Sequence, residues 1–389
     1  MLRLCLAGLL ALAPFFGAAA DALRGTGDMG VVVERASGAL LIIDQTARAA
    51  LGRVTGLGDL SHASVVFSPD ERFAYVFGRD GGLSKVDILH QSITNRVVQS
   101  GNAIGGAISD DGRLVAVSNY QPGGVRVFDA RTLAMVADIP AVWAGGLSKT
   151  IGLVDAPGRR FVFTLWDAGE TWIADFSRGP TPAITKITGI GAYPYDALIT
   201  ADGRRYIVGL FGEDGLTALD LWQDPPRPRR VLAGYGKGEE KRPVYKMPHL
   251  EGWALAGERF VLPAVGRREV LWLDARSLEE VGRTATHGQP VFAVARPDGR
   301  QVWVNFAHPD NDTIQVIDAL TGAVVKQWAP GPAVLHIAFT PRGSEAWVSV
   351  RDAGRVDVYD AHSFEKKAEI KADSPSGIFF TARAHKTGL

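Results

Sequence analysis

Residues 63–99 of the chain read ASVVFSPDERFAYVFGRDGGLSKVDILHQSITNRVVQ and contain four short runs rich in β-branched and aromatic residues. We expect strands at 63–67, 73–77, 83–88 and 94–99, because Ser-Pro-Asp-Glu, Arg-Asp-Gly-Gly and Leu-His-Gln-Ser supply turn residues between them. The third run ends at Asp87, and a short strand ending in Asp recurs throughout the chain. The eight Asp residues lie 42 to 54 residues apart, at Asp44, Asp87, Asp129, Asp175, Asp220, Asp274, Asp318 and Asp360. We interpret them as turn formers at strand ends.

A repeat of this length with four short strands per unit is typical of a β-propeller. Residues 30–33 resemble a second strand without an inner strand before it, and residues 377–381 resemble an inner strand without successors. Together they would complete one blade and remove the open sheet edge. The sequence therefore predicts an all-β protein, an eight-bladed propeller of four-stranded blades, closed by N- and C-terminal strands in one blade. The longest spacing contains an insertion at 222–247, rich in Pro, Lys and Arg, which we expect to lie outside the blade.

Composition agrees with a turn-rich β protein and excludes several function classes. Gly accounts for 45 of 389 residues, about 12% against ~7% in average proteins. The 42 basic and 42 acidic residues cancel, which argues against nonspecific nucleic-acid binding. One Cys cannot form a disulfide framework or a zinc cluster.

The first twenty residues have the layout of a secretory signal peptide. Arg3 precedes an apolar run from Leu4 to Phe16, and small residues precede Asp21. We expect cleavage after residue 20, a propeller over 21–389, and a periplasmic protein without a membrane span. Cys5 lies inside the apolar run, so a lipid anchor on it is not expected.

The ligand face of a propeller is built from the loops that enter the inner strands and the loops that join the two middle strands. The loops before inner strands contribute His62, Lys149, Tyr193, Tyr195, His249, Phe292 and His336, and the middle loops contribute Arg79, Asn119, Tyr120, Trp166, Phe211, Arg267, His308 and Arg351. Such a face suits a flat aromatic ligand that carries carboxylates: aromatic rings stack on it, Arg binds its acids bidentately, and a His can ligate a central metal. His90, His287, His362 and His385 fall outside this face. No esterase elbow, haem-attachment motif, phosphate loop or zinc-protease motif is present.

Two segments resemble a known family. They are Ser61-His62-Ala63-Ser64 followed by residues 75–81, YVFGRDG, and residues 117–122, VSNYQP, followed by the strand at 125–129. On these segments the chain resembles the heme d1-binding propeller domain of the cytochrome cd1 nitrite reductases. Within that group it looks most like the exported proteins that denitrifying bacteria need for heme d1 biosynthesis. The resemblance implies that His62 ligates the heme iron, and that Arg79, Asn119, Tyr120, Lys149, Trp166, Tyr193, Tyr195, Arg267, Phe292 and Arg351 contact the cofactor.

The side of the heme opposite His62 departs from the reductases. They have two His residues there; His249 matches the first, but the position of the second holds Phe292. His308 lies on a middle loop of the same side. The resemblance therefore implies a protein that binds heme d1 or a late precursor and acts in its final maturation, with His249 and His308 as candidate acid–base residues, and not a nitrite reductase.

Three readings remain open at this point. The protein could be an oxidoreductase that modifies the tetrapyrrole, a non-catalytic carrier that delivers heme d1 to cytochrome cd1 nitrite reductase, or a scaffold propeller that binds proteins. Expected partners are the tetrapyrrole, the reductase and other heme d1 maturation proteins.

Overall fold

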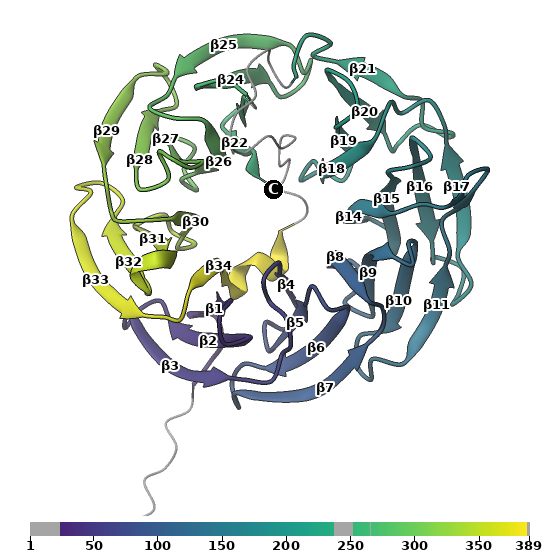
Figure 1. Ribbon diagram of the computed structural model, residues 1–389, viewed down its shortest axis with the longest axis horizontal. Coiled ribbons are helices and arrows are strands. Elements are labelled where there is room, and N and C mark those ends of the chain that lie inside the picture. Colours follow the sequence, from purple (N-terminus) through teal and green to yellow (C-terminus); the bar gives the residue numbers. More distant parts are fainter. Residues whose placement is uncertain (1–23, 237–251, 265, 387–389) are drawn as a thin grey trace, which may run out of the picture.

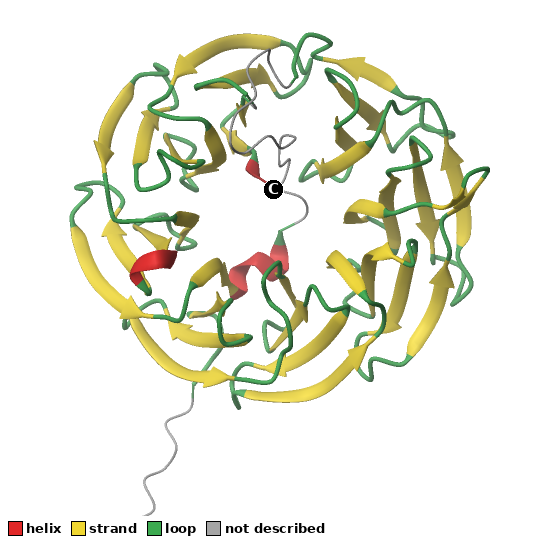
Figure 2. Cartoon of the chain, in the orientation of Figure 1, coloured by secondary structure: helices red, strands yellow, loops and turns green. Residues whose placement is uncertain are grey.

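The computed structural model describes residues 24–236, 252–264 and 266–386. Within these residues, eight four-stranded antiparallel sheets form a closed ring around a central channel (Figure 1). The predicted eight-bladed β-propeller is confirmed. Within each blade the four strands are ordered from the channel outward. The inner strands line the channel, and the outer strands face solvent (Figure 2).

The strand bounds follow the repeat in chain order. The closing blade contains β34 (Pro375–Phe380), β1 (Met29–Glu34), β2 (Ala39–Asp44) and β3 (Ala49–Val54). The next three blades contain β4 (Ser64–Phe67), β5 (Phe73–Phe77), β6 (Gly82–Asp87), β7 (Ser92–Val98); β8 (Asn102–Ile108), β9 (Leu114–Gln121), β10 (Val125–Asp129), β11 (Met135–Ile139); and β14 (Thr150–Ala156), β15 (Arg160–Leu165), β16 (Glu170–Asp175), β17 (Ala183–Ile187).

The remaining four blades contain β18 (Pro194–Ile199), β19 (Arg205–Leu210), β20 (Leu216–Asp220), β21 (Arg229–Val231); β22 (Ala254–Ala256), β23 (Arg259–Pro263), β24 (Glu269–Asp274), β25 (Glu280–Ala285); β26 (Pro290–Ala295), β27 (Gln301–Phe306), β28 (Ile314–Asp318), β29 (Val324–Trp328); and β30 (Val334–Phe339), β31 (Glu345–Val350), β32 (Arg355–Asp360), β33 (Lys366–Lys371). A hairpin of β12 (Val142–Trp143) and β13 (Gly146–Leu147) and two short 3₁₀ helices, η2 (Arg351–Ala353) and η3 (Thr381–His385), complete the described elements.

The eight repeated Asp residues form turns, as predicted. Each carboxylate accepts a hydrogen bond from a backbone N–H two or three residues further along the chain. Asp318 shows the physical effect: the backbone N–H and the hydroxyl of Thr321 stabilise its charged form and hold its pKa below the usual range. The repeat therefore shapes the turns on one face of the ring.

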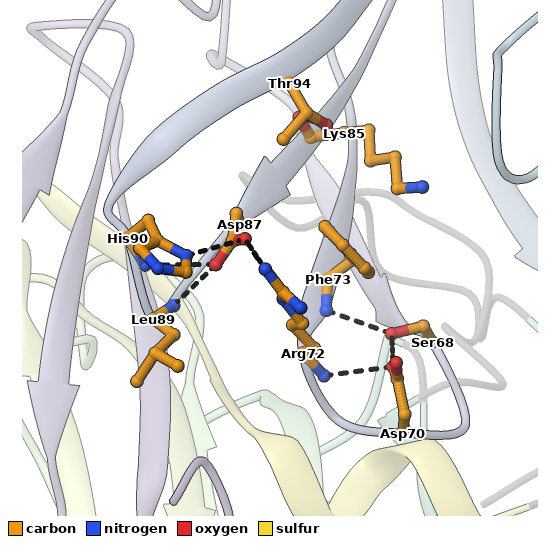
Figure 3. Close-up of polar contacts among 9 residues, drawn as sticks. All are labelled: Ser68, Asp70, Arg72, Phe73, Lys85, Asp87, Leu89, His90 and Thr94. Atoms are coloured by element: carbon orange, nitrogen blue, oxygen red, sulfur yellow. Dashed lines mark hydrogen bonds and ion pairs between the residues drawn. The ribbon is translucent and has the colours of Figure 1, made fainter. Parts of the chain in front are cut away.

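Figure 3 shows this turn in the blade of β4 to β7. Asp87 accepts bonds from the guanidinium of Arg72 at 2.9 Å and contacts Nδ1 of His90 at 3.0 Å. Ser68 accepts a bond from the N–H of the first residue of β5 and donates to Asp70. The polar groups of this turn are thus paired with one another.

Ring closure depends on both ends of the chain. β1 pairs with β2 on one side and with β34 on the other. Glu34, at the end of β1, is completely buried; it accepts hydrogen bonds from Arg53 and from the backbone N–H of Asp373 at 2.8 Å. The predicted closure by terminal strands is therefore confirmed.

The sequence interpretation of the insertion at 222–247 was wrong in one respect. Residues 229–231 form β21, the outer strand of a blade, and pair with β20 from Leu216↔Val231 to Ala218↔Arg229. An outer strand has one face in solvent, so it accepts the two exposed arginines that seemed incompatible with a blade. Residues 237–251 lie outside the described residues, as does the predicted signal peptide at 1–20. Among the described residues, no helix is both long enough and apolar enough to cross a membrane.

Candidate functional site

We call the face built by the loops between second and third strands, and by the loops entering the inner strands, the upper face. Most of the predicted site residues lie there: His62 precedes β4, Arg79 follows β5, Lys149 precedes β14 and Trp166 follows β15. His62, Lys149 and Tyr193 are exposed, whereas the other predicted aromatic side chains on this face are half-buried. The repeat therefore places these side chains on one face although they come from different blades.

Five aromatic residues of three neighbouring blades form one continuous cluster. The ring of Trp166 stacks on Tyr193 with centroids 5.2 Å apart and an interplanar angle of 21°. It also meets Phe211 at 4.9 Å and the edge of Tyr195 at 5.6 Å. The hydroxyl of Tyr120 donates to that of Tyr195 at 3.3 Å and joins the next blade to the cluster. We call these five residues the aromatic wall.

The aromatic wall is neutral and is flanked by cations. Burial raises the pKa of the Tyr120 and Tyr195 hydroxyls, so both stay protonated. The guanidinium of Arg79 lies 5.3 Å from the ring centroid of Tyr120, and Nζ of Lys149 lies 5.8 Å from that of Trp166. Both are cation–π distances. The wall thus offers flat apolar surface with positive charge along its rim.

Tyr193 holds a backbone conformation that its side chain disfavours. Its φ is 51°, in the left-handed region, where a bulky residue without special support is rare. Its carbonyl accepts a bond from Phe211 N–H at 2.8 Å, and its ring is 48% exposed at the edge of the wall. Strain of this kind is found at functional sites because surrounding contacts maintain it.

Several arginines lie near the loop that holds His62, and the sequence analysis missed one of them, Arg35. Arg35 begins the middle loop of the closing blade and donates a hydrogen bond to the carbonyl of Ser61, the residue before His62. Burial lowers the pKa of Arg35, and the nearby charge of Arg351 lowers it further. The rule that identified the other middle-loop residues would also have found Arg35, had it been applied to the strand predicted at 30–33.

Carboxylates near this group are few. Asp59 accepts the backbone N–H of Ser61 at 2.8 Å, and that bond, together with the charges of Arg79 and Arg35, lowers its pKa. Within the described part of the chain, neither Arg35 nor Arg79 has a carboxylate oxygen within 4 Å, and the buried Nε of Arg35 lacks a hydrogen-bond partner. The donors needed to bind an anionic ligand are therefore present.

Three predicted cofactor contacts lie apart from the wall. Asn119 is fully buried, and its amide makes reciprocal hydrogen bonds with that of Gln99 at 2.8 and 3.2 Å. Arg267 lies 3.7 Å from Glu269 in a cavity of about 130 Å³ between two blades. Arg351 pairs with Asp352 at 2.6 Å. Its charge lowers the pKa of Arg35.

On the other side of the channel, Phe292 lies against Gly252, where a Cβ would approach its ring to 2.7 Å. The ring of Phe292 also meets that of His336, with centroids 6.2 Å apart. His308 is exposed in the loop between β27 and β28. His249, the other candidate acid–base residue, lies outside the described residues.

Fold and site together define a propeller whose upper face presents an aromatic wall, two arginines, Arg35 and Arg79, without a carboxylate oxygen within 4 Å in the described chain, and an exposed imidazole; Lys149 on the rim lies 3.9 Å from Asp167. That is the chemistry of a protein that binds a flat aromatic anion. Comparison of the chain with family models gives the same answer. Residues 24–384 match the cytochrome D1 heme domain, and the chain belongs to that family.

Relatives within the family agree with the resemblance predicted from the sequence. The chain is 58% identical over 370 residues to the protein NirF of Pseudomonas aeruginosa and 57% identical to that of Stutzerimonas stutzeri, and covers 94% or more of each. It is 30% identical to a dihydro-heme d1 dehydrogenase of Pseudomonas aeruginosa, of which it spans 64%. Among solved structures, the dihydro-heme d1 dehydrogenase NirN in complex with DHE superimposes with a TM-score of 0.83 over 95% of this chain and 78% of that one, at 26% identity.

Proposed function

We propose that this protein binds heme d1 or a late precursor on its upper face and acts in the final maturation steps of that cofactor in the periplasm. The observation that carries the proposal is the continuous cluster of Arg79, the aromatic wall and Lys149, in a chain of the cytochrome D1 heme domain family. The relative solved with DHE supports a late tetrapyrrole precursor as the ligand class. The layout of residues 1–20, which is that of a secretory signal peptide, supports the compartment.

The residues present fit an anionic tetrapyrrole. The aromatic wall would stack against the macrocycle, and Arg35 and Arg79, which lack carboxylate partners within 4 Å in the described chain, would receive its acid groups. His62 would hold the iron, because its imidazole is exposed on the upper face and the residue before it accepts a hydrogen bond from Arg35. When bound, the group would supply a redox-active iron and a conjugated ring.

The protein's own residues would then orient the ligand and move protons. His249 and His308 are the candidates for proton transfer at the edge of the tetrapyrrole, since imidazole titrates near neutral pH. Phe292 adds an apolar ring to its part of the channel, against Gly252 and beside the imidazole of His336. The site would modify the tetrapyrrole periphery as an oxidoreductase, with the electrons passing to a separate acceptor, and would not reduce nitrite; the relative named dihydro-heme d1 dehydrogenase belongs to that class.

One observation favours a second candidate, a carrier that delivers heme d1 to cytochrome cd1 nitrite reductase. The residues that would contact the ligand first, His62, Lys149 and Tyr193, are exposed on the upper face. Exposed first contacts suit exchange of the cofactor with a partner protein or with other maturation proteins.

Complementation of a deletion strain separates the two candidates. The gene is replaced by a His249→Ala/His308→Ala double variant, and the heme d1 content of the nitrite reductase is measured together with the tetrapyrrole that accumulates. If the protein is a modifying enzyme, we expect a low heme d1 content and an accumulated precursor. A full heme d1 content would instead favour the carrier that delivers heme d1. A purified wild-type protein that binds neither heme d1 nor its precursor would contradict both.

A further inference from the structure

His336 is a half-buried ionisable group on an inner strand, and the sequence analysis placed it on the ligand face without giving it a contact or a chemical role. It is the third residue of β30, and Phe292 is the third residue of β26. Both inner strands have a register shift at this position, Val334/His336 and Pro290/Phe292, so the two side chains occupy equivalent places in neighbouring blades. Figure 1 shows β26, β30 and β34 side by side along the channel. His336 therefore lies level with a predicted ligand contact.

The orientation of the His336 ring is fixed from several sides. Its Nδ1 accepts a hydrogen bond from the backbone N–H of Ile378 in β34 at 3.2 Å. The ring lies between Phe292, at 6.2 Å, and Phe379, at 5.6 Å between centroids. Its own backbone N–H donates to Ser349 Oγ at 2.8 Å. A ring held in this way has a defined direction for its second nitrogen.

The protonation state of the ring follows from its surroundings. Burial lowers the pKa of His336 to about 4, and the positive charge of Arg383 acts in the same direction. The imidazole is therefore neutral near pH 7. Because Nδ1 accepts a hydrogen bond, the single proton resides on Nε2.

The Nε2–H group is directed away from β34, because Nδ1 faces that strand. In the part of the chain that the structure describes, Nε2 has no hydrogen-bond partner, and it is not among the buried polar atoms that lack one. Nε2 therefore keeps some exposed surface, and β30 is the inner strand of its blade, which lines the channel. A neutral donor in an aromatic surrounding suits an uncharged oxygen acceptor better than a carboxylate, which would need a compensating charge.

We propose that His336 donates a hydrogen bond from Nε2–H to a carbonyl oxygen on the periphery of the bound tetrapyrrole, and so distinguishes ligands that carry a ring carbonyl. This inference rests on the proposed function, since it requires a tetrapyrrole in the channel mouth. It adds a positioning and specificity residue to the side of the site that holds Phe292.

Two substitutions by amide residues distinguish the role of Nδ1 from that of Nε2. His336→Asn places an acceptor where Nδ1 lies and keeps the bond from Ile378, but it removes the Nε2–H donor. His336→Gln reaches further and restores a donor near Nε2. Melting temperatures of both variants check that the propeller is folded.

The probe is heme d1, whose ring carbonyls give a stretching band in the resonance Raman spectrum. We expect His336→Asn to shift that band to higher frequency and to weaken binding about tenfold, the effect of one hydrogen bond, while His336→Gln stays close to wild type. An unshifted carbonyl band in a folded His336→Asn variant that binds heme d1 would overturn the inference and leave the proposed function intact. Failure of the wild-type protein to bind heme d1 would instead overturn the proposed function.

Discussion

Replacing Tyr193 with Gly should separate ligand binding from stability. Tyr193 has a φ of 51°, and glycine adopts that conformation without strain. The relief is worth about 1 kcal/mol, but the stacking on Trp166 at 5.2 Å is lost at a cost of about 0.5–1.5 kcal/mol. The greater freedom of glycine in the unfolded chain costs roughly a further 0.5–1 kcal/mol. These contributions largely cancel, so the free energy of unfolding should fall by less than about 1.5 kcal/mol.

The affinity for heme d1 should fall much more. Stacking of a flat heteroaromatic ring on an aromatic side chain is worth about 1–3 kcal/mol in nucleic-acid complexes, which corresponds to roughly a fivefold to 150-fold change in Kd. Absorption titration with heme d1 measures this change, and urea denaturation measures stability. Tyr193→Phe is the matched control and should bind nearly as wild type; Trp222→Ala, which removes an exposed aromatic from the opposite face, should not affect binding. Unchanged affinity in Tyr193→Gly would refute the stacking role.

Three further predictions follow from the site and the channel. Arg79→Gln should weaken heme d1 binding about ten- to a hundredfold, because one charge-assisted hydrogen bond is lost, and equal affinities in a titration at low salt would contradict this. His308→Ala should bind heme d1 like wild type yet lower the heme d1 content of a complemented deletion strain, and full content would exclude proton transfer by His308 alone. Burial raises the pKa of Asp155 to about 6, so its ionisation opposes folding and wild-type stability should decline as pH rises from about 4 to 7. Asp155→Asn should remove that decline and raise the free energy of unfolding at pH 7 by about 1–3 kcal/mol, as measured by denaturation at several pH values. If the stabilities of wild type and variant change with pH in parallel, the raised pKa of Asp155 is refuted.

The fold could be predicted because one local signal recurs. A strand that ends in Asp, with a turn closed by its own carboxylate, depends on residues close in sequence, as the bonds of Asp87 and Asp318 show. The strand predicted at 73–77 has the observed bounds of β5. The outer strand β21 was missed because it lies among the prolines and arginines of an insertion. The local composition there does not indicate a strand, and the strand forms through its pairing with β20.

The sequence predicts on which face of the propeller the site residues lie, but it predicts their individual contacts less well. The repeat gives the loop on which a residue lies, so it follows from the repeat that Arg79 and Lys149 lie beside the aromatic wall. Which way a loop residue points depends on partners in other blades that the repeat does not encode. Asn119 turns inward to Gln99, and Arg267 turns toward Glu269 between the blades.

The central claim is that the upper face binds a heme d1-type tetrapyrrole with His62 on the iron. The most direct measurement is an absorption titration of the purified protein with heme d1, performed on wild type and on His62→Ala. We predict a saturable spectrum of a histidine-ligated heme for wild type, and for a folded His62→Ala variant the loss of that ligation, with the macrocycle still bound through the aromatic wall and Arg79. Identical spectra for the two proteins would show that His62 does not ligate the iron, and no spectral change in wild type would contradict the account as a whole.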